Sequence, residues 1–347
     1  MAKQAGRDPG ARNIRLPSVR ALLMAIAFTD ILEARRRIAG RVLRTPMRRS
    51  AALERVADAP VWLKCEHQQT TGSFKLRGAT NAVLSLTEEE RTRGVVTFST
   101  GNHGRALSHA ANAAGTRAVV CMSALVPPNK VEAIRALGAD IRIVGNSQDE
   151  AERAASALEK AEGLRRVSPM DDAAVIAGQG TLGMEIMEDA PDLETVLVPL
   201  SGGGLISGVA LAVKTLSPKT KVVGVGSKRC PAMAASLEAG RPVEVPEEPS
   251  LADSLGGGIG LENRHTFGMT KRYVDECVLV GEEDIAAGIR FAYEAEGEVI
   301  EGAAAVGIAA LLNGSVKPAG PAAIILTGRN IAPDLHRRVI NGETPQI

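Results

Sequence analysis

Short runs of β-branched and aliphatic residues alternate along the chain with stretches of roughly ten to fifteen residues in which apolar positions recur at helical spacing. Each short run is bounded by glycine, proline or polar residues, as buried strands are. We predict strands over residues 61–65, 95–98, 118–122, 141–144, 196–200, 222–225 and 322–326. This alternation predicts an α/β fold, with parallel sheets flanked by helices on both faces.

Polar residues mark the expected starts of three helices. Serine or aspartate followed three residues later by glutamate is a capping arrangement, and a pair of aspartates before an apolar run has the same effect. These signals are Asp30 with Glu33, Ser147 with Glu150, and the pair Asp171 and Asp172.

Length and composition restrict the class of protein. A chain of 347 residues with 45% hydrophobic content can form two domains or one large unit. The formal net charge of +1 and the 2% aromatic content give no electrostatic or stacking basis for binding nucleic acid, so we expect a small ligand. The four cysteines are widely spaced and form no Cys-x-x-Cys pair, which favours free thiols in a reducing cytoplasm.

The first residues differ from the rest of the chain. Residues 1–23 are rich in arginine and contain Pro9 and Pro17, and the apolar stretch over residues 21–28 is too short to cross a bilayer. We therefore predict a disordered arm over residues 1–23 and no membrane association. A second Met-Ala at Met24 also fits a start codon placed too early.

Lys75 is the first candidate for chemistry. It lies in the string Thr-Gly-Ser-Phe-Lys-Leu-Arg-Gly-Ala of residues 71–79, where Ser73 is expected to cap a helix that begins close to the lysine. The positive end of that helix and nearby anions are expected to lower the pKa of Lys75, so that its amine can form an imine.

Two loops between a strand and a helix complete the candidate site. Residues 99–104, Ser-Thr-Gly-Asn-His-Gly, offer backbone amides to a carboxylate, and residues 201–205, Ser-Gly-Gly-Gly-Leu, can close around a phosphate. A lysine for an aldehyde and a cradle for a phosphate indicate pyridoxal phosphate as the cofactor.

The glycine loop has a rival interpretation as the dinucleotide site of a dehydrogenase. That motif needs an acidic residue about twenty positions on, at the end of the next strand, to bind a ribose. Residues 225–228 read Val-Gly-Ser-Lys and contain no acid, and the glycine pattern is only a partial match.

These strings resemble, in order and spacing, those of the fold-type II pyridoxal phosphate enzymes (tryptophan synthase β-like), in the branch of the threonine dehydratases and serine racemases. The resemblance covers roughly residues 26–341 and includes Ala-Gly-Gln-Gly-Thr at residues 177–181 and Thr-Gly-x-Asn at residues 327–330. Within the branch the chain looks most like the hydroxyectoine-utilisation dehydratases, through residues 68–73, 99–106, 251–260 and 328–331.

The resemblance implies a two-domain fold and a set of site residues. Residues 24–85 and 171–347 would form a large cofactor-binding domain, and residues 86–170 a small mobile domain. Lys75 would hold the cofactor and then remove the substrate's Cα proton. Around the cofactor the resemblance places Phe74, Asn102 at the ring hydroxyl, Gly202, Gly203, Gly204 and Leu205 at the phosphate, and Thr327 at the ring nitrogen.

The substrate's carboxylate would bind to the loop of Ser99, Thr100, Gly101, Asn102 and His103. Thr100 stands where the racemases carry a catalytic serine, and it would either donate a proton to the leaving hydroxyl or have no chemical role. We favour a scaffolding role for His103 over an acid or base role. Glu301 resembles an acidic segment near the ring but is equally explained as the start of a helix, so it is left out of the candidate set.

The racemases bind a divalent cation through acidic residues after the strand that corresponds to residues 222–225. Here that stretch contains Lys228 and Arg229 in place of carboxylates, so we expect no metal site.

The resemblance implies β-elimination from a 3-hydroxy amino acid, because a neutral Thr327 leaves the ring a weak electron sink and disfavours a long-lived carbanion. We expect a compound of hydroxyectoine breakdown, since Gln68, Gln69, Thr70, Thr71 and Arg329 offer polar contacts. The alternatives are a threonine or serine dehydratase of general metabolism and a non-catalytic amino-acid sensor on the same fold. A cytoplasmic homo-oligomer, a dimer in keeping with the family, is the expected assembly.

Overall fold

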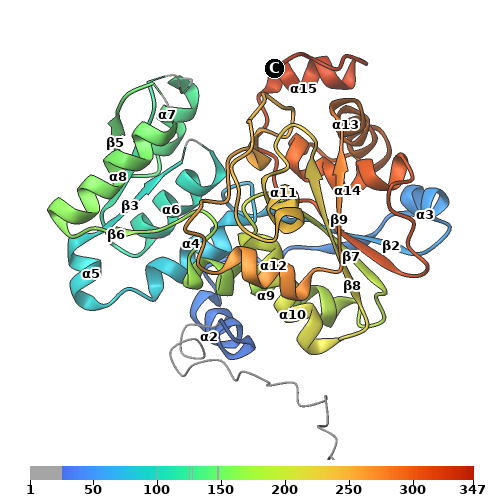
Figure 1. The fold of residues 1–347 in the computed structure, drawn as a ribbon, viewed down its shortest axis with the longest axis horizontal. Helices are drawn as coiled ribbons and strands as arrows, with labels where there is room; N and C mark the ends of the chain where they lie inside the picture. Colours follow the sequence, from blue (N-terminus) through green and yellow to red (C-terminus); the bar gives the residue numbers. More distant parts are fainter. Residues whose placement is uncertain (1–25, 100, 125, 127, 147) are drawn as a thin grey trace, which may run out of the picture.

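The computed structural model describes residues 26–99, 101–124, 126, 128–146 and 148–347, arranged around two sheets that are drawn side by side in Figure 1. The strands are β1 (Met47–Arg49), β2 (Val61–Lys64), β3 (Val95–Phe98), β4 (Ala118–Met122), β5 (Asp140–Ile143), β6 (Arg165–Arg166), β7 (Thr195–Pro199), β8 (Lys221–Ser227), β9 (Glu276–Val280) and β10 (Ala322–Ile325). The α-helices are α2 (Phe28–Ile38), α3 (Ala51–Ala57), α4 (Lys75–Leu84), α5 (Glu88–Arg93), α6 (Asn102–Ala113), α7 (Pro128–Arg135), α8 (Gln148–Glu162), α9 (Ala173–Asp189), α10 (Gly204–Leu216), α11 (Ala232–Ala239), α12 (Thr266–Tyr273), α13 (Glu282–Glu296), α14 (Gly302–Leu312) and α15 (Pro333–Ile340). Two short 3₁₀ helices are η1 (Glu66–Gln68) and η2 (Asp253–Leu255).

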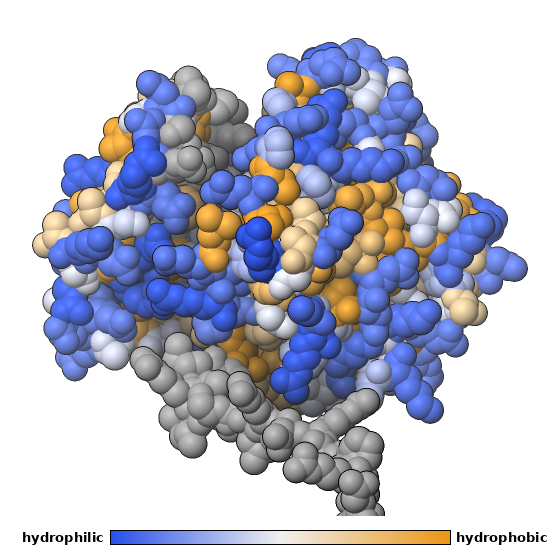
Figure 2. Space-filling view, viewed as in Figure 1, coloured by the Kyte–Doolittle hydropathy of each residue, from blue (hydrophilic) through white to orange (hydrophobic). Residues whose placement is uncertain are grey.

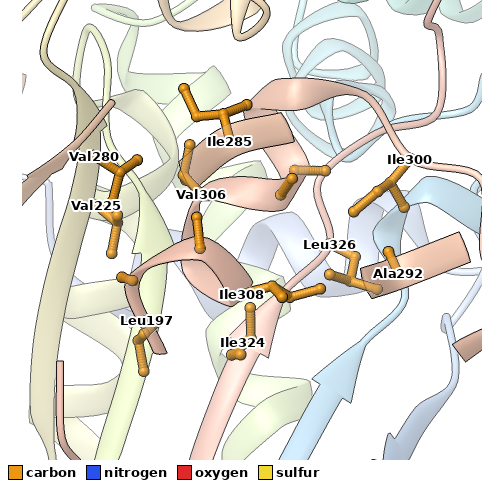
Figure 3. Close-up of a cluster of buried hydrophobic side chains, with 14 of the residues drawn as sticks. Leu197, Val225, Val280, Ile285, Ala292, Ile300, Val306, Ile308, Ile324 and Leu326 are labelled. Carbon is orange, nitrogen blue, oxygen red and sulfur yellow. The ribbon is translucent and has the colours of Figure 1, made fainter. Parts of the chain in front are cut away.

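The larger sheet has six strands in the order β1-β2-β10-β7-β8-β9, and all neighbours are parallel except β1 and β2. Its strands are apolar on both faces because helices cover both. Leu197 of β7 packs with Val306 and Ile308 of α14 on one face, as Figure 3 shows. Val196 and Val198 point to the other face and pack with residues of α9 and α10.

The smaller sheet has four parallel strands in the order β5-β4-β3-β6. Val119 and Cys121 of β4 pack with α8, whereas Val120 and Met122 pack in the cluster that includes α4 and α6. All four strands come from residues 95–166, between β2 and β7 of the larger sheet. The division into a large domain and a small mobile domain stays a prediction.

The predicted α/β class with parallel sheets is confirmed, and each of the seven predicted strands is present with bounds shifted by at most a few residues. Three strands were missed: β1, β6 and β9. Each lies at an edge of its sheet. An edge strand buries fewer side chains, so polar residues such as Arg165 and Arg166 give no apolar run to recognise.

The three predicted helix starts have different outcomes. Asp172 caps α9 as expected, because its carboxylate accepts hydrogen bonds from the N–H groups of Ala174 (2.9 Å) and Val175 (3.1 Å). Asp30 is not the cap of α2, which begins two residues earlier, but its carboxylate accepts a bond from the N–H of Ala27 (2.7 Å). The predicted cap Ser147 lies outside the described residues, as does the predicted arm over residues 1–23.

All four cysteines are free, which confirms the prediction of unpaired thiols. None of the helices within the described ranges is long and apolar enough to cross a bilayer. On the face drawn in Figure 2, hydrophilic side chains cover most of the surface and apolar residues gather toward its centre.

Candidate active site

The candidate site forms where segments far apart in the sequence meet beyond the carboxyl ends of strands, the usual place for ligands in parallel sheets. After β10, the carbonyl of Thr327 accepts a hydrogen bond from the N–H of Phe74 (3.0 Å), next to Lys75. Asn330 then reaches the start of α6, where its side-chain amide donates to Oδ1 of Asn102 (2.5 Å). The loops before α4, before α6 and after β10 therefore meet in space.

Lys75 is half-buried and is the first residue of α4. Its Nζ donates to the backbone carbonyl of Pro169 (2.8 Å). Burial lowers the pKa of the Lys75 amine from 10.5 to about 8, while the negative charge of Glu301 opposes this shift. About one tenth of the amine is therefore neutral at pH 7, which a nucleophile or base requires.

Two details of the sequence interpretation of Lys75 are wrong. Phe74, not Ser73, occupies the cap position of α4, and the Ser73 hydroxyl is buried with no hydrogen-bond partner in the described part of the chain. The neighbouring anion raises the pKa of Lys75 instead of lowering it, so burial is the cause of the shift.

A close crossing of α4 and α9 fixes the position of Lys75. A Cβ atom at Gly178 would lie 2.6 Å from Cα of Gly78, so only glycine allows the two helix backbones to approach this closely. Gly78 belongs to the lysine string and Gly178 to the string of residues 177–181. Two motifs far apart in the sequence are therefore two sides of one helix contact.

A buried ionic cluster lies around Arg77, two residues after Lys75 on α4. Arg77 is fully buried, and its guanidinium donates to Glu66 (2.8 and 2.9 Å) and to Glu185 (2.7 and 2.8 Å). Lys64 also donates to Glu185 (2.7 Å). Burial alone would raise the pKa of Glu66, but the charge of Arg77 holds that pKa below its usual value. The cluster ties α4 to β2, η1 and α9.

Asn102, Glu301 and Asn330 form a buried hydrogen-bonded group. The carboxylate of Glu301, which is 4% exposed, accepts from Nδ2 of Asn102 (2.7 Å) and from the backbone N–H of Asn330 (3.1 Å). It makes no capping bond to its own helix α14. Glu301, left out of the candidate set, thus lies among the candidate residues. In the sequence this contact leaves one trace, the glycine of the Thr-Gly-x-Asn string at residues 327–330. A Cβ atom at Gly328 would lie 2.5 Å from Glu301 Oε1, so a larger residue would displace the carboxylate.

His103 is a buried, neutral side chain. Its Nε2 lies 3.2 Å from the carbonyl of Val167, which fixes the proton on that nitrogen. Burial, and secondarily the charge of Lys75, lower the pKa of His103 to about 3. A group that stays neutral across the physiological range favours the scaffolding interpretation over that of an acid or base.

The glycine loop lies at the start of α10 and close to Lys75. Gly203 has φ +88°, and a Cβ atom there would lie 2.7 Å from Cε of Met233, so the position requires glycine. Met170, the residue after the Pro169 that accepts from Lys75, packs on Gly202 and Gly204. The first N–H groups of α10 have no partner within the helix and are available to an anion.

The remaining candidates occupy the same region or lie outside the described residues. Thr327 is buried beyond β10, Phe74 packs at the edge of the core of the larger sheet, and Leu205 is buried in the first turn of α10. Ser99 and Gly101 are half-buried before α6. Thr100 lies outside the part of the chain that the structure describes. The roles assigned to these residues stay predictions.

The arrangement fits pyridoxal phosphate. An amine of lowered pKa and a glycine loop with available N–H groups are connected through the consecutive residues Pro169 and Met170. Ser73 and Thr71 contribute buried hydroxyls, and His103 a buried ring nitrogen, that have no partner in the described part of the chain. Buried polar atoms are normally satisfied, so these groups can bond a polar ligand that enters the site.

Comparison with known proteins agrees with this geometry. The model of the family "Pyridoxal-phosphate dependent enzyme" matches residues 38–328. An L-threonine ammonia-lyase of Thermotoga maritima is 45% identical over 316 residues, which are 91% of this chain and 78% of the relative. The structure of maize serine racemase superposes with a TM-score of 0.86 at 31% identity, covering 91% of this chain and 97% of that chain. Threonine deaminase isoform 2 of Solanum lycopersicum gives 0.82 at 33% identity, covering 90% and 91%.

Proposed function

The chain belongs to the family of pyridoxal-phosphate dependent enzymes, and we propose that it eliminates the hydroxyl group of a 3-hydroxy amino acid. At the level its relatives share, it is a pyridoxal-phosphate dependent lyase of the threonine dehydratase type. The net products are a 2-oxo acid and ammonia, because the water lost in the elimination is returned in the hydrolysis that releases ammonia.

Lys75 is the proposed anchor and base. When bound, the cofactor supplies an aldehyde that joins the substrate's amino group and a ring that withdraws electrons from its α-carbon. Lys75 would hold the aldehyde at rest and take the α-proton during turnover. The observation that carries the proposal is its half-buried amine, with a pKa of about 8, connected through Pro169 and Met170 to the glycine loop.

The other residues would hold and orient. The N–H groups of Gly202, Gly203, Gly204 and Leu205 would bind the phosphate, and Asn102, held by Glu301, would meet the ring hydroxyl. A neutral Thr327 at the ring nitrogen would not hold a proton there, which limits the build-up of charge at the α-carbon and favours loss of the hydroxyl.

The loop of residues 99–103 would orient the amino acid. Its backbone N–H groups at the start of α6 suit a carboxylate, and the buried, neutral His103 keeps the loop in place through Val167. We assign to Thr100 the protonation of the leaving hydroxyl.

The proposed substrate is a 3-hydroxy amino acid of hydroxyectoine breakdown, such as a derivative of 3-hydroxy-2,4-diaminobutyrate. Thr70, Thr71 and Arg329 support it, because they line a cavity beside the candidate site. Gln68 and Gln69 do not, which corrects the sequence interpretation. Gln68 donates to Glu298 (3.3 Å), and the buried Gln69 bonds both backbone groups of Leu43.

The second candidate is a threonine or serine dehydratase of general metabolism, which the threonine ammonia-lyase and threonine deaminase among the relatives support. A cytoplasmic homodimer is the proposed state in either case. A non-catalytic sensor would bind an amino acid without needing the Lys75 amine.

Purified enzyme supplied with pyridoxal phosphate and a panel of 3-hydroxy amino acids tests the function, with ammonia release as the readout. We expect release by the wild type and loss of at least about a thousandfold in Lys75→Ala. A visible absorption band that borohydride abolishes in the wild type, and that Lys75→Ala lacks, separates the enzyme from a sensor.

Lys271→Ala is the matched control, because this lysine is exposed and lies in the last turn of α12. Near-normal ammonia release by Lys75→Ala would refute the assigned role. A kcat/KM for L-threonine well above that for the hydroxyectoine-derived compounds would make the second candidate correct.

A further inference from the structure

Three consecutive residues between β6 and α9 contact separate parts of the molecule around the candidate site. The carbonyl of Pro169 accepts a hydrogen bond from Nζ of Lys75 (2.8 Å). Met170 packs on the glycine loop, where a Cβ atom at Gly202 would lie only 1.7 Å from its Sδ atom. Asp171 belongs to the aspartate pair that predicts the start of α9, but its carboxylate bonds the start of a different helix.

Asp171 caps α12 from 93 positions earlier in the chain. Its carboxylate accepts hydrogen bonds from the backbone N–H groups of Arg264 (2.7 Å), His265 (2.9 Å) and Thr266 (3.0 Å). The first N–H groups of a helix have no partner within it, and the side chain of His265, the cap residue of α12, bonds none of them. Asp171 therefore supplies the side-chain cap that the local sequence of α12 does not provide.

The capped end of α12 packs against the start of α10, beside which Figure 1 draws it. Thr266 is fully buried, and a Cβ atom at Gly203 would lie 2.8 Å from the Cβ atom of Thr266. In the first turn of α10, the hydroxyl of Ser207 donates to the carbonyl of Thr266 (3.4 Å). The Thr266 side chain is itself held, because its Oγ1 accepts from Nδ2 of Asn263 (2.7 Å).

Asp171 joins the two side chains that contact the glycine loop. Met170 and Thr266 contact successive glycines of residues 202–204. Asp171 follows Met170 in the chain and accepts from the N–H of Thr266, so it fixes the two contacting residues relative to each other. A shift of either residue would move the N–H groups of the loop, because the glycines leave no space between the loop and its neighbours.

We propose that Asp171 is a positioning residue for the cofactor's phosphate, which holds α12 and the segment before α9 against the glycine loop so that the loop's N–H groups converge on the phosphate. The inference rests on the proposed function, because it takes the glycine loop to bind the phosphate of pyridoxal phosphate. Positioning and charge predict opposite effects. A carboxylate close to a phosphate repels it, so charge alone predicts tighter binding once Asp171 is neutralised, whereas loss of positioning predicts weaker binding.

Equilibrium titrations of the full-length, cofactor-free protein test the proposal. The probes are pyridoxal phosphate and pyridoxal, which has the aldehyde but no phosphate. Asp171→Ala loses all three bonds to α12, whereas Asp171→Asn keeps one acceptor oxygen. The affinity for pyridoxal phosphate should fall at least about tenfold in Asp171→Ala and by a smaller factor in Asp171→Asn, while the affinity for pyridoxal stays within about twofold. Unchanged or tighter binding of pyridoxal phosphate in both variants would overturn the proposal, as would equal losses for both probes.

Asp284→Ala is the matched control. Asp284 is also a half-buried aspartate at the start of a helix, where its carboxylate accepts from the N–H of Gly281 (2.9 Å) before α13. Its loss should leave both affinities within about twofold. A loss of pyridoxal phosphate binding as large as that in Asp171→Ala would refute the proposal, because any missing cap would then have the same effect. If Asp171→Ala does not fold, Asp171→Asn provides the same comparison.

The outcome is separable from that of the proposed function. The visible absorption band that borohydride abolishes reports on Lys75 by itself. This band in the wild type, with equal affinity for pyridoxal phosphate in all variants, would retain the role of Lys75 and reject that of Asp171. Inorganic phosphate that binds the wild type at least about tenfold more tightly than Asp171→Ala in calorimetry, with no band in the wild type, would retain the role of Asp171 and reject that of Lys75.

Discussion

Replacing Glu66 by glutamine removes one of the two carboxylates that bind the fully buried guanidinium of Arg77. Glu66 is itself fully buried and accepts two hydrogen bonds from Arg77, at 2.8 and 2.9 Å, and one from the Thr45 hydroxyl. In Glu66→Gln, Arg77 keeps only Glu185 as a carboxylate partner, which it already shares with Lys64, and the glutamine side chain offers one acceptor oxygen where Glu66 offered two. The cluster then carries an uncompensated positive charge away from water.

Breaking a buried ion pair by removing one partner destabilises a protein by about 3–5 kcal/mol, because the remaining charge stays desolvated. We expect a loss of this size in the free energy of unfolding at pH 7. Glu188→Gln is the matched control, because Glu188 is 36% exposed and its partners Arg35 and Arg44 are 46% and 47% exposed. Such a surface pair contributes only about 0–1 kcal/mol.

The pH dependence has a definite sign. The pKa of Glu66 is lower in the folded than in the unfolded protein, so its stabilisation is present at neutral pH and is lost as the pH falls through the folded pKa. The difference between the wild type and Glu66→Gln should therefore shrink below about pH 4.

Urea unfolding of both variants and the wild type, followed by circular dichroism and by Trp62 fluorescence, measures these differences. Coincident transitions with the two probes establish that one unfolding step is compared. A loss in Glu66→Gln no larger than that in Glu188→Gln would refute the reasoning that the cluster is desolvated and held by both carboxylates.

Three further predictions concern the candidate site. The cofactor-free Lys75→Met variant should be more stable than the wild type at pH 7 by about 1–3 kcal/mol in urea unfolding, because the folded protein disfavours the charged amine. This gain should vanish as the pH rises from about 8 to above 10.5, where the lysine of the wild type is neutral in both the folded and the unfolded protein. The ring signals of His103 should not titrate between pH 5 and 8 in NMR spectra, and a midpoint near 6.5 would contradict its burial. Gly203→Ala should weaken binding of pyridoxal phosphate at least about tenfold in equilibrium titrations, because the backbone there has φ +88° and the added methyl group would meet Met233. The control Gly268→Ala should bind the cofactor normally, because no atom lies within 4 Å of a Cβ atom at that position.

The local pattern of the sequence determined the elements and the order of the loops. Buried strands leave apolar runs, so all seven predicted strands are present, and the strings of residues 71–79, 99–104 and 201–205 follow from turn and helix-start chemistry. These strings were grouped by the chemistry of one cofactor and by family resemblance, because β3 and β7, which precede two of them, belong to different sheets and share no common edge. The edge strands β1 and β6 were missed because they are short and rich in arginine, whereas β9 contains the apolar run Cys-Val-Leu-Val and was overlooked.

Tertiary packing alone decided which side chains meet within the site. Glu301 lies 199 positions from Asn102 in the sequence, and Asn330 lies 228 from it, yet both bond its amide. Gln68 and Gln69 are adjacent to the threonines of the cavity but bond Glu298 and Leu43 instead. Spacing along a chain fixes the face of a helix or strand, whereas the partner across that face depends on how whole elements pack, which no local pattern encodes.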